Sequence, residues 1–501
     1  MKSFASDPVL SCEEAGSWER QLFGGEESRE WPAMRRAGVA LARAVLADFE
    51  EVGGFSGEGR ILVLAGKGHN GGDALIAAQV ILEQHPRVVV EVRLVFGERR
   101  LRPLASRAWR ELFAVGMGRV RAVRSAAVAG RYELCLDGIF GWQFRSPVDA
   151  AVAGLLGRVN ALPIRLRAAV DLPSAGLFQA DFTYATGCVK TPVVDAVAAG
   201  RVRYLDLGFF SDGDAWADGA GGWQGEVRAR VLTVAGLAPL SGWRASRSDK
   251  RSFGHVMVVG GSRNYPGAVL MTVLAALRSG VGLVTAFVPE TLVGALASRA
   301  PEAMWVGWPE TPAGGLALEG EHLWGMRKER ASALVLGPGL GYEPETLALA
   351  ARIVATSPVP LVLDADALRP EVVRAGGMPR IVTPHAGEWA RIAASLPEGG
   401  GVTQVLKGPV TRVVSGAGEI YYSFFGGPVL ARGGSGDLLA GLIGGLLAQT
   451  PTDPLGAAVR GVVWQGRAAD FLARARGAVA VSATQLLDFL PAALRDSGHE
   501  Q

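Results

Sequence analysis

The stretch ARGGSGDLLAGLIGGLLAQ, residues 431–449, is the part of the chain that best indicates how it folds. Its first part is rich in glycine, and its second part spaces leucine and isoleucine as along one face of a helix. Glycine lets backbone N–H groups approach an anion, and a helix start adds the positive end of its dipole. We therefore predict an anion-binding loop at Gly434, Ser435 and Gly436, directly before a buried helix.

Asp437 places a carboxylate directly after this loop. A lone carboxylate would repel phosphate, so the position is best explained by a base that deprotonates a hydroxyl group attacking a phosphoryl group. This arrangement is typical of kinases. The alternative from the residues alone is a glycine-rich turn before a helix with no chemical role.

The composition excludes several classes of protein. With 501 residues, 49% of them hydrophobic, the chain is long enough for two or three domains. A net charge of +3 does not indicate the strongly basic surface of a nucleic-acid-binding protein. Cys12, Cys135 and Cys188 are too widely spaced for a metal site or a disulfide framework. Because neither a membrane span nor a signal peptide is visible, we expect a cytoplasmic protein without membrane association.

Short apolar runs alternate with helical patterns along the chain, which predicts two α/β domains with mostly parallel sheets. A Gly-, Asp- and Ala-rich stretch at 211–226 interrupts the pattern, so we place the domains at 1–225 and 226–501. In such sheets ligands bind beyond the carboxyl ends of the strands. Nearly every polar or glycine-rich motif here directly follows an apolar run.

The second block carries a series of such motifs. Asp364 and Asp366 follow a strand and could hold Mg²⁺ directly or through water. His385 and Glu388 follow the next strand, where His385 could contact a ligand. Lys407 leaves an apolar run at a position suited to nucleotide phosphates, with a solvated hairpin lysine as the equally weighted alternative. The motifs are, in order, K-x-x-F-G (250–254), GGSRNYPGA (260–268), GPGLG (337–341), DADAL (364–368), TPHAGE (383–388), LKG (406–408) and GGSGD (433–437).

Together these motifs resemble the ribokinase-like superfamily and, more closely, its ADP- or ATP-dependent NAD(P)H-hydrate dehydratases. The resemblance covers about 250–491 and implies a ribokinase-like α/β/α fold. It implies Mg²⁺ as cofactor and phosphorylation of the S hydrate of NADH or NADPH, followed by loss of phosphate. Asp437 would be the catalytic base. Hydrate contacts would come from Ala268, Gly339, His385 and Asp437, and nucleotide contacts from Lys407, Gly408, Pro409, Val410, Thr411, Gly434, Ser435 and Gly436.

The first block places polar side chains after three apolar runs. Oxygens of Asn70, Asp137 and Ser174 could enclose a monovalent cation, while the glycines of GKGHNGGD (66–73) accept phosphate. The alternative is three ordinary turns. From 34 to about 209 the block resembles NAD(P)H-hydrate epimerases, which implies a Rossmann-like three-layer α/β/α fold. The resemblance implies K⁺ at Asn70, Asp137 and Ser174. It also implies hydrate contacts at Asn70, Gly71, Gly72, Asp73 and Asp171, and in the loop from Gly141 to Pro147.

The chain departs from these families at several positions. In the first block these are His69, Ala74, Trp142 with Gln143, and Ala175, and in the second block they are Arg432 and Gln465. Trp142 in place of a threonine could fill the substrate cleft, and Ala74 in place of a glycine could shift the phosphate loop. The cation-binding set and Asp171 are retained. We also expect a homo-oligomer, because the superfamily often assembles.

Three functions fit these observations. The first is a two-domain repair enzyme that interconverts the R and S hydrates in one half and dehydrates the S hydrate in the other. The second is a ribokinase-like small-molecule kinase that releases a phosphorylated product. The third is an active dehydratase attached to a non-catalytic N-terminal binding module. The YPGA and PHAGE motifs favour a dehydratase over the kinase, and epimerisation by residues 1–225 would eliminate the third function.

Overall fold

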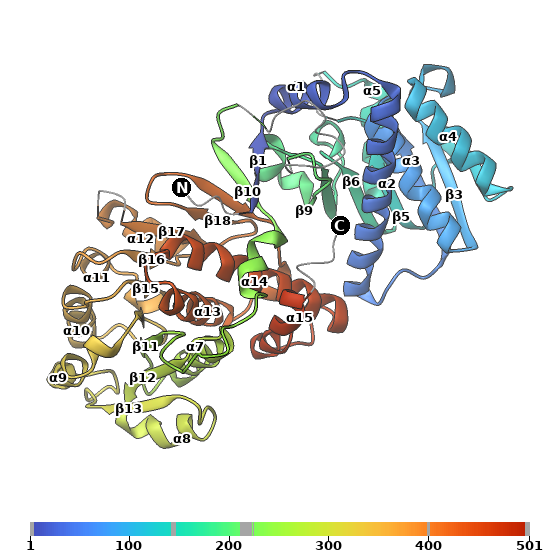
Figure 1. Ribbon diagram of the computed structural model, residues 1–501. Helices are drawn as coiled ribbons and strands as arrows, with labels where there is room; N and C mark the ends of the chain where they lie inside the picture. Colours follow the sequence, from blue (N-terminus) through green and yellow to red (C-terminus); the bar gives the residue numbers. More distant parts are fainter. Residues whose placement is uncertain (1–4, 142–146, 211–222, 224, 398–400, 496–501) are drawn as a thin grey trace. The chain divides into compact units, whose positions relative to one another are not determined.

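The computed structural model describes residues 5–141, 147–210, 223, 225–397 and 401–495, which form two compact units (Figure 1). The N-terminal unit holds residues 7–231 and 474–477. The C-terminal unit holds 232–473 and 478–501, together with the first six residues. Each unit is built around a sheet flanked by helices, so the expected α/β fold class is confirmed. The predicted linker at 211–226 lies mostly outside the described residues.

The sheet of the N-terminal unit has the strand order β4-β3-β2-β5-β6-β7-β9, and all of these strands are parallel. Its strands are β2 (Glu58–Ala65), β3 (Arg87–Leu94), β4 (Val120–Ala122), β5 (Tyr132–Gly138), β6 (Ile164–Val170), β7 (Phe182–Thr186) and β9 (Arg201–Leu205). Strand β1 (Ser6–Leu10) pairs in parallel with β8 (Val189–Lys190). The helices are α1 (Cys12–Phe23), α2 (Glu27–Phe49), α3 (His69–Gln84), α4 (Pro103–Gly116), α5 (Ala150–Ala161) and α6 (Thr191–Val194).

Alternation of apolar residues along β2 creates the three layers of this unit. Ile61 and Val63 belong to one core cluster together with residues of α2, α3 and α4. Leu62 and Leu64 point to the opposite face and pack in a second cluster with residues of α5. Because both faces of the strand are buried, it reads as a continuous apolar run, as parallel strands do.

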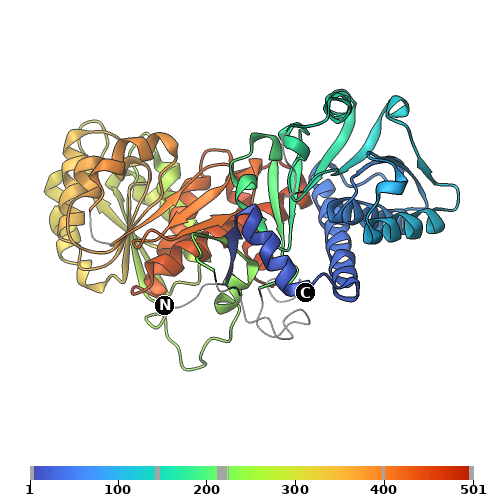
Figure 2. The ribbon, with the colours of Figure 1, turned by 90° about the horizontal axis from the view of Figure 1, so that it is seen from above.

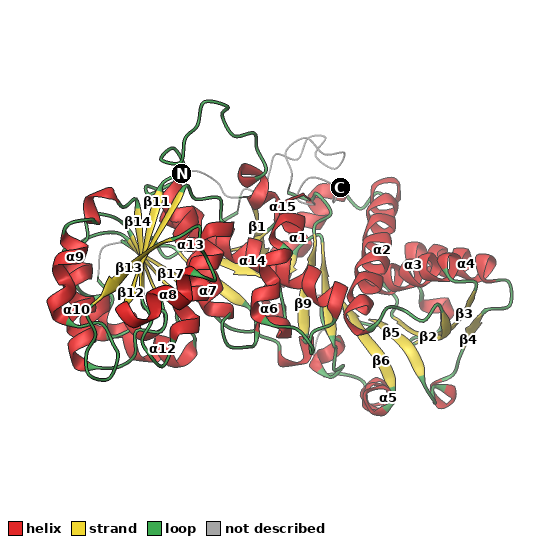
Figure 3. Ribbon diagram, turned by 90° about the horizontal axis from the view of Figure 1, so that it is seen from below, coloured by secondary structure: helices red, strands yellow, loops and turns green. Residues whose placement is uncertain are grey.

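The C-terminal unit has the strand order β13-β12-β11-β14-β15-β16-β17-β18-β19. The sheet is parallel from β13 to β17, and β17, β18 and β19 pair antiparallel at its edge. Figure 3 shows these strands between layers of helices. The strands are β11 (His255–Val259), β12 (Leu283–Pro289), β13 (Met304–Trp308), β14 (Ala333–Leu336), β15 (Leu361–Leu363), β16 (Arg380–Val382), β17 (Val402–Leu406), β18 (Thr411–Val414) and β19 (Ile420–Ser423), and β10 (Ala229–Leu232) precedes them.

Two cores again lie on the two faces of the sheet. Val256 and Val258 of β11 pack with α7, α13 and α14, while Met257 and Val259 pack with α10, α11 and α12. The helices are α7 (Pro266–Arg278), α8 (Val293–Ala297), α9 (Glu321–Gly325), α10 (Pro344–Ala355), α11 (Pro370–Val373), α12 (Ala386–Ile392), α13 (Ser435–Gln449), α14 (Pro454–Arg476) and α15 (Leu490–Arg495). Helix α7 begins at Pro266, because proline is well suited to a first helical turn.

Helices α7 and α13 lie side by side and touch closely (Figures 1 and 2). A Cβ atom at Gly441 would lie 2.1 Å from the carbonyl oxygen of Thr272, and one at Gly445 would lie 2.0 Å from Ser279 Oγ. Any larger residue at these two positions would therefore force the helices apart.

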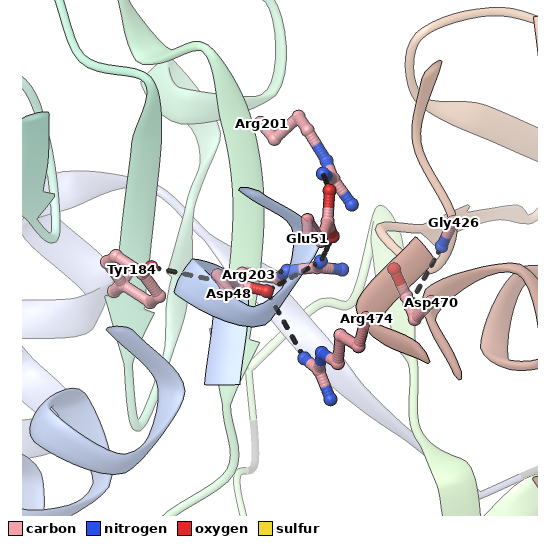
Figure 4. Close-up of polar contacts among 8 residues, drawn as sticks. All are labelled: Asp48, Glu51, Tyr184, Arg201, Arg203, Gly426, Asp470 and Arg474. Carbon is pink, nitrogen blue, oxygen red and sulfur yellow. Dashed lines mark hydrogen bonds and ion pairs between the residues drawn. The ribbon is translucent and has the colours of Figure 1, made fainter. Parts of the chain in front are cut away.

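A buried charged cluster stabilises the N-terminal unit (Figure 4). Asp48, which is 1% exposed, accepts hydrogen bonds from Arg203 Nη2 at 2.9 Å, Tyr184 Oη at 3.1 Å and Arg474 Nη2 at 3.2 Å. The arginines hold the pKa of this carboxyl below its usual value despite its burial.

No helix in the described part of the chain is long and apolar enough to span a bilayer.

Candidate active sites

The glycine-rich loop of the C-terminal unit lies at the start of α13, as the sequence predicts. Gly434 has φ +94°, and a Cβ atom there would lie 2.4 Å from Met271 Sδ on α7. Glycine at this position thus provides both the left-handed backbone and the space next to α7. Ser435 is the first residue of α13, and its Oγ donates to the carbonyl oxygen of Leu430 at 2.7 Å.

Asp437 lies beside a buried lysine–aspartate pair. Lys407 Nζ donates to Asp364 Oδ1 at 2.9 Å, and Thr383 Oγ1 donates to the same oxygen at 2.6 Å. A Cβ atom at Gly436 would lie 3.2 Å from Lys407 Nζ, which places the ammonium group next to the anion-binding loop. Burial, followed by the negative charge of Asp364, raises the pKa of Asp437 to about 6.

Ala268 and Gly339 meet at the end of the sheet. Gly339 has φ +70°, and a Cβ atom there would lie 3.1 Å from Ala268 Cβ and 2.4 Å from the carbonyl oxygen of Tyr265. Ser262 Oγ donates to the carbonyl oxygen of Gly339 at 2.8 Å. This contact ties the loop after β11 to the loop after β14, so two predicted hydrate-binding residues lie together.

His385 has a structural role in addition to the predicted one. It is the N-cap of α12, where its Nδ1 accepts from the backbone N–H of Gly387 at 3.0 Å. Glu388 Oε2 accepts in return from the backbone N–H of His385 at 2.9 Å, which completes a capping box. Because Nδ1 is used in the cap, Nε2, which lies 3.5 Å from Glu388 Oε1, is the ring nitrogen that a ligand would contact.

The predicted nucleotide segment, 407–411, connects β17 to β18. Its first residue, Lys407, takes part in a parallel bridge with His385, and its backbone N–H donates to the carbonyl oxygen of Pro384 at 2.9 Å. Gly408 and Pro409 are exposed, whereas Thr411 begins β18 opposite Ser423.

Two side chains support the glycine-rich loop before α13 through contacts that the sequence did not predict. Gln465 Nε2 on α14 donates to the carbonyl oxygen of Ser435 at 2.7 Å. Arg432 donates to the carbonyl oxygens of Val481 and Ala478, so its guanidinium group holds the segment after α14. Gln465 and Arg432 are the two departures noted in the sequence, and both make contacts that order the loop.

The predicted cation-binding residues of the N-terminal unit come together from three loops. Ser174 Oγ donates to Asp137 Oδ1 at 2.7 Å, and the backbone N–H of Ser174 donates to Asp137 Oδ2 at 2.8 Å. Asn70 Nδ2 donates to the carbonyl oxygen of Val170 at 3.0 Å. A Cβ atom at Gly141 would lie 2.6 Å from Asn70 Oδ1, so Asn70 Oδ1 faces the chain after β5.

Asp137 is fully buried, and its burial raises the pKa of the carboxyl to about 6. The hydrogen bonds to this carboxylate come from Ser174 and from the backbone N–H of Ile139, which are uncharged donors. A buried carboxylate with neutral donors and nearby amide and hydroxyl oxygens is suited to a monovalent cation.

A cavity of about 470 Å³ lies beside this cluster and is lined by residues of the N-terminal unit alone. Asn70, Asp73 and Asp171, three of the predicted hydrate-binding residues, line it. Gly71 and Gly72 lie in the first turn of α3, where a Cβ atom would come within 2.5 Å of the carbonyl oxygen of Gly66 or of Met34 Sδ, respectively. The glycines therefore let α3 begin close to the cavity.

The departures in this unit differ in their consequences. Ala74 is a regular residue of α3 and is buried, so the helix itself does not require a glycine there. Ala175 has φ +58°, a left-handed conformation that non-glycine residues seldom adopt. His69 Nε2 lies 3.5 Å from Glu30 Oε2, and both residues line the cavity. Trp142 and Gln143 lie outside the described residues.

Comparison with known proteins assigns the family. A family model described as NAD(P)H-hydrate dehydratase matches residues 256–492, and one described as YjeF-related protein N-terminus matches residues 32–197. The bifunctional NAD(P)H-hydrate repair enzyme of Gloeobacter violaceus is 35% identical, with 91% of this chain and 92% of that protein aligned. The protein of the same name from Moorella thermoacetica is 32% identical, with 93% of each chain aligned.

The chain belongs to the bifunctional NAD(P)H-hydrate repair enzymes. Its two matched regions are the epimerase and the ADP/ATP-dependent dehydratase of that family. Among solved structures, an ADP/ATP-dependent NAD(P)H-hydrate dehydratase from Bacillus subtilis, co-crystallised with ATP and Mg²⁺, is 28% identical. It covers 51% of this chain and 94% of its own, with a TM-score of 0.44.

Proposed function

We propose that Asp437 of this repair enzyme deprotonates the hydroxyl group of the S hydrate for attack on the terminal phosphoryl group of ADP or ATP. The meeting of Asp437, Lys407, Asp364 and Gly436 at one end of the sheet supports this proposal. Backbone amides of Gly434 to Gly436 stabilise the charge on the transferred group. The ring nitrogen then expels phosphate, which is a better leaving group than hydroxide, and the dihydronicotinamide ring is restored.

Lys407 and the N-terminal end of α13 bind the phosphates of the nucleotide in this proposal. The ammonium group of Lys407 is already next to the loop, and Asp364 orients it through the 2.9 Å contact. Ala268, Gly339 and His385 contact the hydrate, with Nε2 of His385 as its available atom. The segment 408–411, where Gly408 and Pro409 are exposed, then contacts the nucleotide from the other side.

The charges at this site are suited to Mg²⁺. The negative charges of Asp364 and Asp366 raise the pKa of Asp437, whereas the positive charge of Lys407 lowers it. Within the described residues no group of three His, Cys, Asp or Glu side chains is arranged to hold a metal alone. Mg²⁺ typically uses one or two carboxylates together with substrate phosphates. Asp364 and Asp366 would hold it, and it would neutralise charge on the transferred phosphoryl group.

We propose that the N-terminal unit interconverts the R and S hydrates in its cavity, with K⁺ held by Asn70, Asp137 and Ser174. The buried Asp137 carboxylate with its uncharged donors supports the cation. Bound K⁺ would supply a fixed positive charge near the phosphate groups of the hydrate. Gly71, Gly72, Asp73, Gly141 and Asp171 complete the surroundings of the hydrate.

The test uses the full chain with Mg²⁺, K⁺ and either nucleotide. With the pure S hydrate, absorbance of the dihydronicotinamide should return with one phosphate released per molecule recovered. A phosphorylated product that accumulates without recovery would instead indicate a small-molecule kinase. Asp437→Asn should abolish recovery, whereas Asp488→Asn, an exposed aspartate in the same unit, should not.

With a mixture of both hydrates, complete recovery by the parent protein is expected. Recovery that stops when the S hydrate is exhausted, apart from the spontaneous rate, would contradict the proposed epimerase and favour a non-catalytic N-terminal module.

A further inference from the structure

The cavity of the N-terminal unit has an unusual set of charged groups at its floor. Glu19, Asp73 and Asp171 line it, and Lys190, 1% exposed, lies behind them. Lys190 Nζ is 2.9 Å from Asp171 Oδ2 and 3.9 Å from Glu19 Oε1. Three carboxyl groups thus share one ammonium group. With all three carboxyl groups ionised the set would carry a net charge of about −2, and a proton kept by one of them reduces this to about −1.

Asp171 is the carboxylate that Lys190 holds in place. Its backbone is left-handed, with φ +65°, which is rare for a residue with a side chain. Its Oδ1 accepts from the backbone N–H of Thr186 at 3.0 Å and from Thr186 Oγ1 at 2.8 Å, while Oδ2 accepts from Lys190. Three hydrogen bonds therefore hold the side chain of Asp171 in one orientation.

Asp73 is the carboxyl group that keeps a proton. It is 6% exposed, and within the described residues its buried Oδ1 has no hydrogen-bond partner. Burial, followed by the charges of Asp171 and Glu19, raises the pKa of Asp73 well above its usual value, while Lys190 opposes this rise. A neutral carboxyl group in contact with the cavity can donate its proton to a ligand.

Other charged or titratable groups surround the cluster of Glu19, Asp73, Asp171 and Lys190. Cys188 and Cys12 lie near Lys190, and burial raises the pKa of both thiols. The charged or titratable residues that line the rest of the cavity are Arg20, Glu27, Glu30, His69 and Arg102.

We propose that Asp73 is the proton donor that drives inversion of the hydrate, and that Lys190 is a positioning residue that holds Asp171 in place. The proposal rests on the proposed epimerase reaction. The hydrate carries its hydroxyl group on the ring carbon next to nitrogen. Inversion at this carbon requires one of its bonds to break, and a neutral acid beside two carboxylates favours loss of water.

Asp73 gives its proton to the hydroxyl oxygen, and the carbon–oxygen bond breaks with its electron pair leaving on water. The nitrogen lone pair forms a carbon–nitrogen double bond, and the carboxylates of Asp171 and Glu19 stabilise this cation. Water adds to the opposite face of the ring carbon. The proton that it loses returns to the carboxyl groups, which restores neutral Asp73.

The test follows conversion of the pure R hydrate to the S hydrate by the full chain with K⁺, without nucleotide. Asp73→Asn keeps the shape of the side chain and removes the acid, so the inversion rate should fall about 100-fold. Asp195→Asn, an exposed control in the same unit, should invert at the parent rate. Dehydration of the S hydrate, measured separately with ATP, should be unchanged in both variants and shows that each chain is folded.

Lys190 is tested through the pH dependence. Loss of its positive charge in Lys190→Met should raise the pKa of Asp73, so the basic limb of the pH–rate profile should move to higher pH while kcat falls. Lys190→Arg keeps the charge and should restore the limb. A fall in rate without any movement of the limb would show a merely structural lysine. In water labelled with ¹⁸O, the inverted product should carry one labelled oxygen.

The outcomes separate the two proposals. A parent protein that inverts the R hydrate no faster than the spontaneous rate would overturn the epimerase function and the inference with it. A parent protein that inverts the hydrate, together with Asp73→Asn at full rate, would overturn only the inference. Inversion without incorporation of labelled oxygen would overturn the loss of water and leave the epimerase function intact.

Discussion

Replacement of Asp437 by asparagine should abolish dehydration and, at the same time, make the C-terminal unit more stable at neutral pH. Burial and the charge of Asp364 raise the pKa of Asp437 from 3.8 to about 6. At about 1.4 kcal/mol per pH unit, ionisation of this group in the folded protein costs about 3 kcal/mol at pH 7 relative to the unfolded chain. Asparagine has a similar shape and bears no charge, so it avoids this cost.

The sign of the effect follows from the direction of the shift. Because the folded protein holds the proton more tightly, the contribution of Asp437 to stability is greatest below pH 3.8 and is lost as pH rises through about 6. The variant should thus match the parent near pH 3.5 and exceed it by up to about 3 kcal/mol at pH 7.5. Chemical denaturation at both pH values measures the difference.

The same pKa fixes the pH dependence of the parent enzyme. With a value of about 6, only about one Asp437 in eleven is ionised at pH 5, so kcat/KM for the S hydrate should be about tenfold lower than at neutral pH. An ordinary aspartate would be ionised at both pH values. A flat profile between pH 5 and 7, or an asparagine variant no more stable than the parent at pH 7.5, would refute the reasoning.

Three further substitutions test other parts of the structure. Gly436→Ala places a Cβ atom 3.2 Å from Lys407 Nζ and should raise KM for ATP about tenfold in steady-state kinetics; an unchanged KM would exclude this loop from nucleotide binding. Ser174→Ala removes the 2.7 Å hydrogen bond to Asp137 and should raise the K⁺ concentration needed for half-maximal inversion, measured by titration; an unaltered requirement would move the cation elsewhere. Asp48→Asn breaks buried ion pairs and should lower the free energy of unfolding of the N-terminal unit by about 3 to 5 kcal/mol in denaturant; a loss below 1 kcal/mol would show that the cluster is dispensable.

Much of the fold could be predicted because parallel strands are buried on both faces. Val256 to Val259 and Ile61 to Leu64 are continuous apolar runs, and each is followed by its ligand loop. Strands β7 and β9 were missed, because Thr183 and Arg203 interrupt the apolar pattern. The capping role of His385 was also missed, because histidine is seldom a helix cap.

The floor of the N-terminal cavity could be predicted only in part, because Asp73 and Asp171 belong to recognisable motifs but Glu19 and Lys190 do not. Lys190 ends a two-residue strand, and Glu19 belongs to a helix that precedes the first recognisable motif. Neither residue lies within a periodic pattern that could reveal its partner. Asp171 and Lys190 meet because the chain turns between β6 and β8, and only the three-dimensional structure shows this contact. The three acidic side chains and the single lysine therefore come together through the fold and not through a local sequence pattern.

The close contact of α7 and α13 has a consequence for how the dehydratase site can move. Residues at the start of each helix belong to the proposed site, and the glycines at 441 and 445 bring the two helices into close contact. We therefore expect these helices to move as one rigid body during turnover. Closure over a nucleotide would then involve the segment 408–411, where Gly408 and Pro409 are exposed, and its movement should set the rate at which product departs.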